Sequence, residues 1–187
     1  MAAATEPSLP EKLLATDRAL TEAKLAHAFG GAIALAYYAE PRATIDIDIN
    51  VFAAASEFER IAAALEPLGV DTATDRLALE RDGQCRLRWG RTPIDLFFSY
   101  ADLHAAMIAA TRRVPFADSQ IDILSPDHLI VCKAVFDRPK DWLDIEQMLV
   151  VADGLHRDEI ERWIAEIVGE DSENLRRFSA LADELLG

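Results

Sequence analysis

Residues 44–51 alternate strictly between polar and apolar side chains, in the order Thr-Ile-Asp-Ile-Asp-Ile-Asn-Val. Because successive side chains of a strand point to opposite faces, this period of two predicts a β-strand with one buried and one polar face. Asp46 and Asp48 are expected on the polar face, roughly 6.6 Å apart. The buried face is expected to carry Ile45, Ile47, Ile49 and Val51.

Residues 93–99 repeat the alternation, with Asp95 among the polar positions. If this strand pairs beside residues 44–51, three carboxylates meet on one sheet surface. Such close carboxylates repel each other unless a cation lies beside them, and Mg²⁺ prefers oxygen ligands. Asp46, Asp48 and Asp95 are therefore candidate ligands of a two-metal site. The alternative, favoured for an Asp-x-Asp motif alone, is an acidic face turned to water.

The order of the remaining elements predicts mixed α/β structure first and helices afterwards. Asp82-Gly83 predicts a hairpin turn between strands at 76–81 and 84–89. Ser56 is expected to cap a helix, with Glu59 as its capping-box partner. Further short strands are expected near Val114 and at 121–124. Expected helices span about 11–26, 32–39, 56–68, 101–110, 157–168 and 172–186.

Ser125-Pro126-Asp127 is a strong helix start, because proline fits the first turn of a helix. The helix that follows is interrupted at Arg138-Pro139, and a second one continues beyond it. The change in composition near Ser125 predicts two parts, an α/β part over residues 1–124 and a helical part over 125–187.

Two further groups of residues are candidates for binding. Gly30-Gly31 stands just before a predicted helix, where backbone amides favour phosphate, although most such pairs mark ordinary turns. Lys133 on an apolar helix face either reaches solvent or meets a buried anion. Asp141 and Asp144 share a helix face, and surface ion pairs are the alternative interpretation of these charges.

The net charge of −14 predicts repulsion from nucleic acid unless positive charge is gathered locally. No segment approaches the roughly 18 apolar residues of a membrane span, and no secretory signal is recognised at the start. Two cysteines without metal-type spacing favour a reduced, cytoplasmic protein. Arginines gather in two groups that either form one basic lane for RNA or balance nearby acids: Arg81, Arg86, Arg88 and Arg91, then Arg112 and Arg113.

Taken together, these motifs resemble the nucleotidyltransferase superfamily of the DNA polymerase beta type, and most closely the AbiEii-type toxin nucleotidyltransferases. The resemblance covers residues 29–144. Its segments are Phe29-Gly-Gly-Ala-Ile-Ala-Leu, Arg42-Ala-Thr-Ile-Asp-Ile-Asp48, Ile94-Asp95-Leu96, Lys133 and Arg138-Pro-Lys-Asp141-Trp-Leu-Asp144. It implies a nucleotidyltransferase-like mixed sheet flanked by helices, followed by a helical subdomain.

The resemblance also implies an enzyme that moves a nucleoside monophosphate from a nucleoside triphosphate to an acceptor hydroxyl. Asp46, Asp48 and Asp95 would bind Mg²⁺ or Mn²⁺, with Asp95 also acting as the base. Residues implied in holding the nucleotide are Gly30, Gly31, Ala32, Lys133, Arg42, Lys140, Asp141 and Asp144. The superfamily commonly has serine where this chain has Ala32, so one hydrogen bond to phosphate is missing.

The acceptor stays open among tRNA, a small molecule and a protein, and a cognate antitoxin is an expected partner. The main alternative is a non-catalytic module of the same fold that binds nucleotide or antitoxin. A metal-dependent nuclease also uses clustered carboxylates and ranks below both.

Overall fold

The computed structural model describes residues 6–99 and 102–186. The chain divides into two compact units, and the division falls at the glycine pair. The first unit holds the residues up to Gly30 together with Thr44–Ile123, and the second holds Gly31–Ala43 together with the residues from Leu124 onward. Residues 31–43 thus group with the C-terminal helices, while the proposed domains 1–124 and 125–187 stay a prediction from the sequence.

The first unit is built on a mixed sheet with the order β3-β4-β2-β1-β6-β5 among the described residues. Strand β2 runs parallel to β4 and antiparallel to β1, and β1 runs parallel to β6. The two hairpins β3–β4 and β5–β6 close the sheet at its two edges. The strands are β1 His27–Phe29, β2 Ile47–Val51, β3 Gln84–Trp89, β4 Thr92–Phe98, β5 Arg112–Phe116 and β6 Ser119–Ile123.

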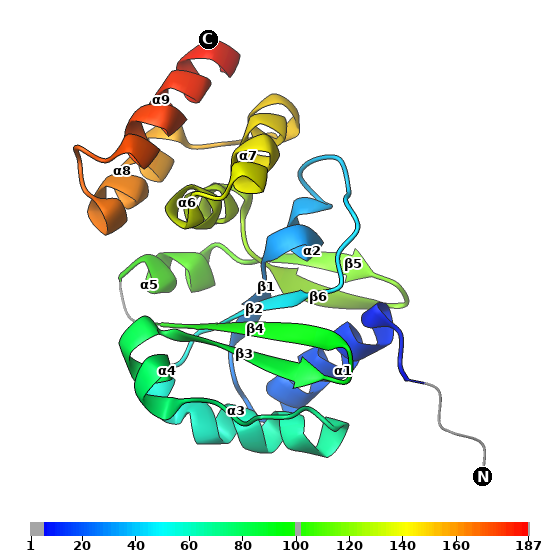
Figure 1. Ribbon diagram of the computed structural model, residues 1–187. Coiled ribbons are helices and arrows are strands. Elements are labelled where there is room, and N and C mark those ends of the chain that lie inside the picture. The colour runs from blue at the N-terminus through cyan, green and yellow to red at the C-terminus, as the bar shows by residue number, and fades with distance from the viewer. Residues whose placement is uncertain (1–5, 100–101, 187) are drawn as a thin grey trace. The chain divides into compact units, whose positions relative to one another are not determined.

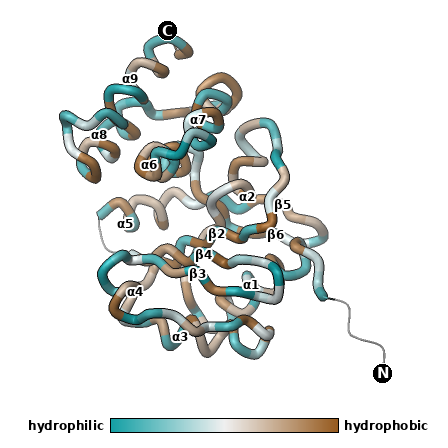
Figure 2. The backbone as a smooth tube through the Cα atoms, viewed as in Figure 1, coloured by the Kyte–Doolittle hydropathy of each residue, from teal (hydrophilic) through white to brown (hydrophobic). Residues whose placement is uncertain are grey.

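One face of this sheet is the core of the first unit. Alternate residues of β2 and β4 are fully buried: Ile47, Ile49, Val51, Ile94, Leu96 and Phe98. Helices α1 (Leu9–Glu22) and α3 (Phe58–Leu65) lie on one side of the sheet (Figure 1). Each contributes fully buried aliphatic side chains, Leu13 and Leu20 from α1 and Ile61 and Leu65 from α3. Figure 2 shows hydrophobic stretches along the central strands, as this buried face requires.

The alternation therefore predicts the buried face of both strands, with one exception. Ile45 was expected to be buried, yet it is 71% exposed. The reason is that β2 begins only at Ile47, so Ile45 lies in the irregular segment ahead of the strand. Asp46 is also in that segment, one residue before the strand starts.

The hairpin predicted at Asp82-Gly83 is wrong. Residues Arg76–Asp82 form helix α4, whose first amides are capped by the Asp75 carboxylate. Gly83 ends this helix in the left-handed region at φ 62°. The same backbone conformation serves a hairpin turn and a helix C-terminus, so Asp-Gly alone does not separate them. The actual turn between β3 and β4 contains Gly90, at φ 59°.

Other predicted elements are present with shifted ends. The predicted helix 56–68 consists of α3 between two 3-10 turns, Ala55–Glu57 and Glu66–Leu68, and Ser56 makes no side-chain cap. The helix expected at 32–39 is shorter, since α2 spans Gly31–Leu35. Helix α5 covers Asp102–Ala109. Among the described residues, no helix combines the length and apolar character needed to cross a bilayer.

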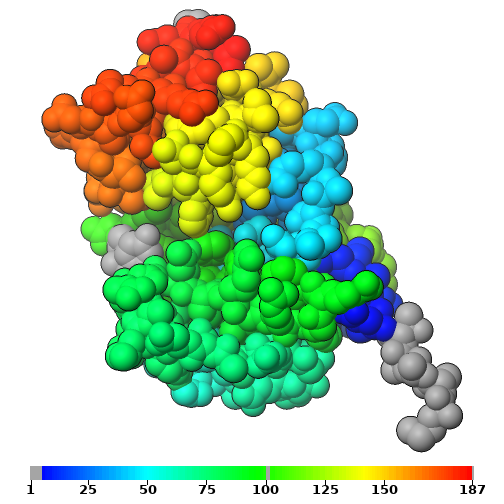
Figure 3. All heavy atoms as spheres, viewed as in Figure 1, coloured from blue at the N-terminus to red at the C-terminus, as the bar shows by residue number. Residues whose placement is uncertain are grey.

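The second unit is helical. Its elements are α2, α6 (Pro126–Phe136), α7 (Pro139–Val151), α8 (Arg157–Val168) and α9 (Glu173–Leu185). Ser125 caps α6 by accepting a hydrogen bond from the His128 amide, as the Ser-Pro-Asp start predicts. Trp142 and Phe178 are buried at its core, and the side chains of α7 and α9 (yellow and red in Figure 3) form part of its surface.

Candidate active site

Strand pairing brings Asp48 and Asp95 side by side. In the parallel ladder of β2 and β4, Asp48 is the direct partner of Asp95. Directly paired residues on neighbouring strands point to the same face, and neighbouring strands lie about 4.8 Å apart. Both carboxylates are half-buried, on the face opposite to the buried isoleucines. The two alternating segments of the sequence are thus neighbours, with an acidic residue of each on one surface.

Asp46 lies two residues before Asp48, immediately ahead of β2. It is also half-buried, and its backbone N–H donates to the hydroxyl of Thr44 at 3.2 Å. Asp46 and Asp48 therefore lie at the start of β2, and Asp95 lies in the middle of β4, directly beside Asp48. The roles of Asp46, Asp48 and Asp95 as metal ligands, and of Asp95 as a base, stay predictions.

Arg86 is a further member of this group, and its pairing with Asp95 agrees with the interpretation that the clustered arginines balance nearby acids. It lies on β3 as the direct partner of Asp95, and its Nε and Nη2 donate to the two oxygens of Asp95, each at 2.7 Å. These hydrogen bonds raise the pKa of the Arg86 guanidinium above its usual value, and the nearby charges of Asp95, Asp46 and Asp48 act in the same direction. The guanidinium thus sits in the negative potential of all three carboxylates.

The glycine pair is connected to this acidic group through the backbone. The Gly30 N–H donates to the Asp48 carbonyl oxygen at 2.9 Å. Gly31 has a φ of 52° and opens α2, a helix of five residues. Ala32 follows and is buried. The positive φ favours glycine at position 31, while phosphate binding by these residues stays a prediction.

A second charged cluster lies within the helical unit. The Lys133 Nζ donates to Asp144 at 2.6 Å and lies 3.7 Å from an oxygen of Asp141. Arg42 donates to both oxygens of Asp144, at 3.3 and 3.2 Å, and Arg138 donates to both oxygens of Asp141. Three cations thus face two carboxylates, which leaves one positive charge in excess.

The centre of this cluster is buried, while the side chains of Arg42 and Arg138 reach the surface. Lys133, Asp141 and Asp144 are 3%, 0% and 4% exposed. The alternative interpretation, that these charges form surface ion pairs such as Lys140 with Asp144, is therefore wrong for Asp144. Its lysine partner is the buried Lys133. Lys140 is exposed, and the described residues include no ion pair for it.

The arginines do not form a single basic lane. Strands β3 and β5, which carry Arg86 and Arg113, lie at opposite edges of the sheet. Most of the six are paired with acids instead, in the pairs Arg81–Asp82, Arg86–Asp95, Arg91–Glu6 and Arg113–Asp122. Charge alone thus provides no continuous surface for nucleic acid on this sheet.

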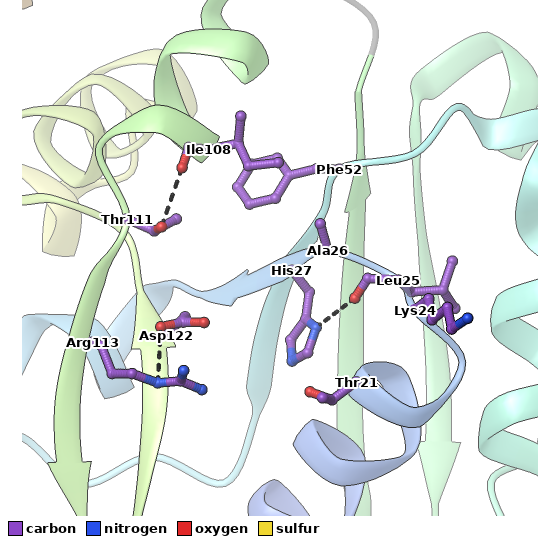
Figure 4. A pocket seen from close by; sticks show the side chains of 10 residues that line it. All are labelled: Thr21, Lys24, Leu25, Ala26, His27, Phe52, Ile108, Thr111, Arg113 and Asp122. Atoms are coloured by element: carbon purple, nitrogen blue, oxygen red, sulfur yellow. Dashed lines mark hydrogen bonds and ion pairs between the residues drawn. The ribbon is translucent and has the colours of Figure 1, made fainter.

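A cluster of possible ligands and a cavity lie apart from the predicted site residues. Asp127, His156 and Glu159 place three possible ligand atoms within 4.8 Å of one another, but Asp127 already accepts from both the backbone and the ring of His156 and so ties down the start of α8. A cavity of about 410 Å³ in the first unit (Figure 4) is lined in part by Lys24, His27 and Asp122. None of the predicted site residues lines that cavity.

Several solved structures share this fold at low sequence identity. ANT(2'')-Ia, described as an antibiotic-resistance factor, aligns with a TM-score of 0.55 over 94% of this chain and 89% of its own, at 15% identity. Its complex with adenylyl-2''-tobramycin aligns with a TM-score of 0.53 over 94% of this chain and 97% of its own, at 14% identity. The lincosamide antibiotic adenylyltransferase LnuA aligns with a TM-score of 0.52 over 74% of this chain and 94% of its own, at 13% identity.

The particular family follows from the sequence. Residues 12–185 match the family described as "Nucleotidyl transferase AbiEii toxin, Type IV TA system". The chain therefore belongs to the AbiEii nucleotidyltransferase family, and it is a nucleotidyltransferase with a mixed α/β fold. Both the resemblance and the fold class expected from the sequence are confirmed. No curated protein matches the chain in sequence.

Proposed function

We propose that this nucleotidyltransferase uses Asp46, Asp48 and Asp95 to hold Mg²⁺ or Mn²⁺, and moves a nucleoside monophosphate from a nucleoside triphosphate to an acceptor hydroxyl. The observation that supports the proposal best is the register of β2 and β4, which pairs Asp48 with Asp95.

The donor set fits a hard divalent cation. All three side chains offer carboxylate oxygens, the ligands that Mg²⁺ prefers. Carboxylates on neighbouring strands repel each other, so this arrangement is costly without positive charge nearby. Arg86 supplies one positive charge against three negative ones, so these four side chains keep two negative charges to offer a metal.

When bound, divalent cations in such sites neutralise the phosphates and activate the attacking and leaving oxygens. The chain's own residues position the two reactants and accept a proton. Asp95 takes the proton of the acceptor hydroxyl, whose oxygen then forms a bond to the α-phosphorus. The bond from that phosphorus to the bridging oxygen breaks, and pyrophosphate leaves with the electron pair. Holding both reactants in line accounts for much of the acceleration expected of such an enzyme.

The remaining predicted residues have supporting roles in this proposal. Gly30, Gly31 and Ala32 offer backbone amides to phosphate, without the side-chain hydroxyl that serine would add. That missing hydrogen bond is worth about 1–3 kcal/mol to a charged group. In the helical unit, the excess positive charge of the cluster around Lys133 suits an anionic ligand. Asp141 and Asp144 hold the lysine in place, and Arg42 orients Asp144. Lys140 is exposed and therefore free to reach a ligand.

The acceptor is proposed by class only. ANT(2'')-Ia and LnuA carry the names of antibiotic-modifying enzymes, which favours a small hydroxyl compound, whereas the type IV toxin–antitoxin family favours a cellular target such as tRNA or a protein. A role as the toxin of such a pair, with a cognate antitoxin, belongs to the same proposal. We place the protein in the cytoplasm.

The test is transfer of α-labelled nucleotide, with each of the four triphosphates, into cell RNA, protein and small molecules. Label should be incorporated only with Mg²⁺ or Mn²⁺, and Asp48→Ala should abolish incorporation while leaving the circular dichroism spectrum unchanged. Asp122→Ala is the matched control, because Asp122 is also a half-exposed aspartate on the sheet but pairs with Arg113. Wild-type turnover by Asp48→Ala would show that the metal assignment is wrong.

A second candidate is a module that binds nucleotide without turnover, and the observation that favours it is Ala32 at the glycine turn. It predicts thermal stabilisation by a triphosphate with Mg²⁺ but no incorporation of label into any fraction. Incorporation that depends on Asp48 would exclude it.

A further inference from the structure

The contact between Arg86 and Asp95 occupies the carboxylate that the proposed reaction needs most. Both Asp95 oxygens accept a hydrogen bond from the Arg86 guanidinium, each at 2.7 Å. The Asp95 side chain is 16% exposed, whereas that of Arg86 is 55% exposed. The arginine thus approaches the carboxylate from the solvent side of the edge strand β3.

A bidentate arginine fixes a carboxylate in position and orientation, because two parallel hydrogen bonds leave it little freedom to rotate. Without a cation, Asp95 would repel its direct neighbour Asp48. The guanidinium therefore supplies both charge and geometry to the acidic group. A divalent cation would seek the same oxygens and the same negative potential, so the two cations compete.

We propose that Arg86 is a positioning residue that holds Asp95 ready as a metal ligand in the metal-free protein, and that a divalent cation takes at least one Asp95 oxygen from it. This inference rests on the proposed function, since it assumes that a metal binds at Asp48 and Asp95. Arg86 is then a counter-ion for the acidic group when no metal is bound, rather than a link that only ties β3 to β4.

The two roles predict opposite changes in metal affinity when Arg86 is removed. If Arg86 only ties the strands together, its removal weakens the sheet and loosens the metal ligands, so metal affinity falls or stays constant. If Arg86 competes with the metal, its removal destabilises the metal-free protein but strengthens metal binding. A unit charge a few ångströms from a divalent ion in a solvated site changes affinity by roughly tenfold.

The experiment is titration of the full-length, metal-free protein with Mn²⁺ by isothermal calorimetry, paired with thermal unfolding without metal. Arg86→Met is expected to lower the melting temperature without metal and to bind Mn²⁺ roughly tenfold more tightly than the wild type. Arg86→Lys keeps the charge but loses the two-point contact, so its affinity should rise by a smaller factor. It also serves as the deciding variant if Arg86→Met does not fold.

Arg88→Met is the matched control. Arg88 lies two residues further along β3 and on the same face, but it is opposite Pro93, and its side chain has no ion pair in the described part of the chain. Its removal takes away the same charge without freeing Asp95, so Mn²⁺ affinity should change by clearly less than with Arg86→Met. An equal gain in Mn²⁺ affinity in both variants would show that only the loss of a positive charge matters, and it would overturn the inference.

Asp48→Asn tests the metal site itself, independently of the role of Arg86. Mn²⁺ binding that is lost in Asp48→Asn, but unchanged or weakened in the Arg86 variants, would overturn the role of Arg86 alone. If the wild-type protein bound no Mn²⁺, or if Asp48→Asn bound it equally well, the metal site itself would be wrong and the inference would fall with it.

Discussion

Replacing Lys133 with methionine should destabilise the helical unit by about 3 kcal/mol. The Lys133 Nζ donates to Asp144 at 2.6 Å, and both side chains are nearly inaccessible to solvent. Methionine fills a similar volume, so the cost comes from the carboxylates left behind. Removing one partner of a buried ion pair costs about 3–5 kcal/mol, because the other charge stays buried without compensation. The lower end applies here, since Arg42 still donates to both oxygens of Asp144.

The assay is urea unfolding followed by tryptophan fluorescence, to which the buried Trp142 and Trp163 of the same unit respond. The double variant Lys133→Met with Asp144→Leu should be more stable than the sum of the two single effects by at least about 1 kcal/mol, as expected for residues in contact. A loss below about 1 kcal/mol for Lys133→Met would refute the reasoning, because it would mean that the lysine reaches solvent and the pair contributes little.

Three further outcomes follow from local contacts. Hydrogen bonds from Lys12 and the Arg91 amide lower the pKa of Glu6 from 4.5 to about 2. The ionised Glu6 therefore stabilises the fold above pH 4.5, and this effect is lost as the pH falls towards 2. Glu6→Gln should flatten the dependence of the free energy of unfolding on pH in this range. Burial raises the pKa of the Cys85 thiol to about 11, so iodoacetamide should label it slowly at pH 8 and much faster near pH 11. Ser125→Ala removes the α6 cap and should cost about 1 kcal/mol in urea unfolding.

The sequence predicts those features of the fold that depend on local patterns. Alternation identifies the buried faces of β2 and β4, and the Ser-Pro-Asp start locates α6, because both signals lie within a few consecutive residues. The same local view fails at Gly83, where the glycine ends a helix instead of turning a hairpin. It also fails at Ile45, because the first residue of a strand depends on the partners that it finds in the sheet.

The site shows a similar division. As candidate metal ligands, Asp46, Asp48 and Asp95 are recognisable from the alternation and from the family resemblance, and their role stays a prediction. The contact of Arg86 with Asp95 depends on the register of β3 against β4, which is set by a turn that the sequence misplaced. The burial of Lys133 beside Asp144 depends likewise on how two helices pack, so the charges alone favoured surface ion pairs instead.

Anomalous diffraction from crystals soaked in Mn²⁺ with a non-hydrolysable triphosphate shows most directly whether Asp48 and Asp95 hold a divalent cation. We expect an anomalous peak about 2.0–2.2 Å from carboxylate oxygens of both residues, where a small divalent ion binds. A peak at Asp127, His156 and Glu159, with none at Asp48 and Asp95, would contradict this expectation.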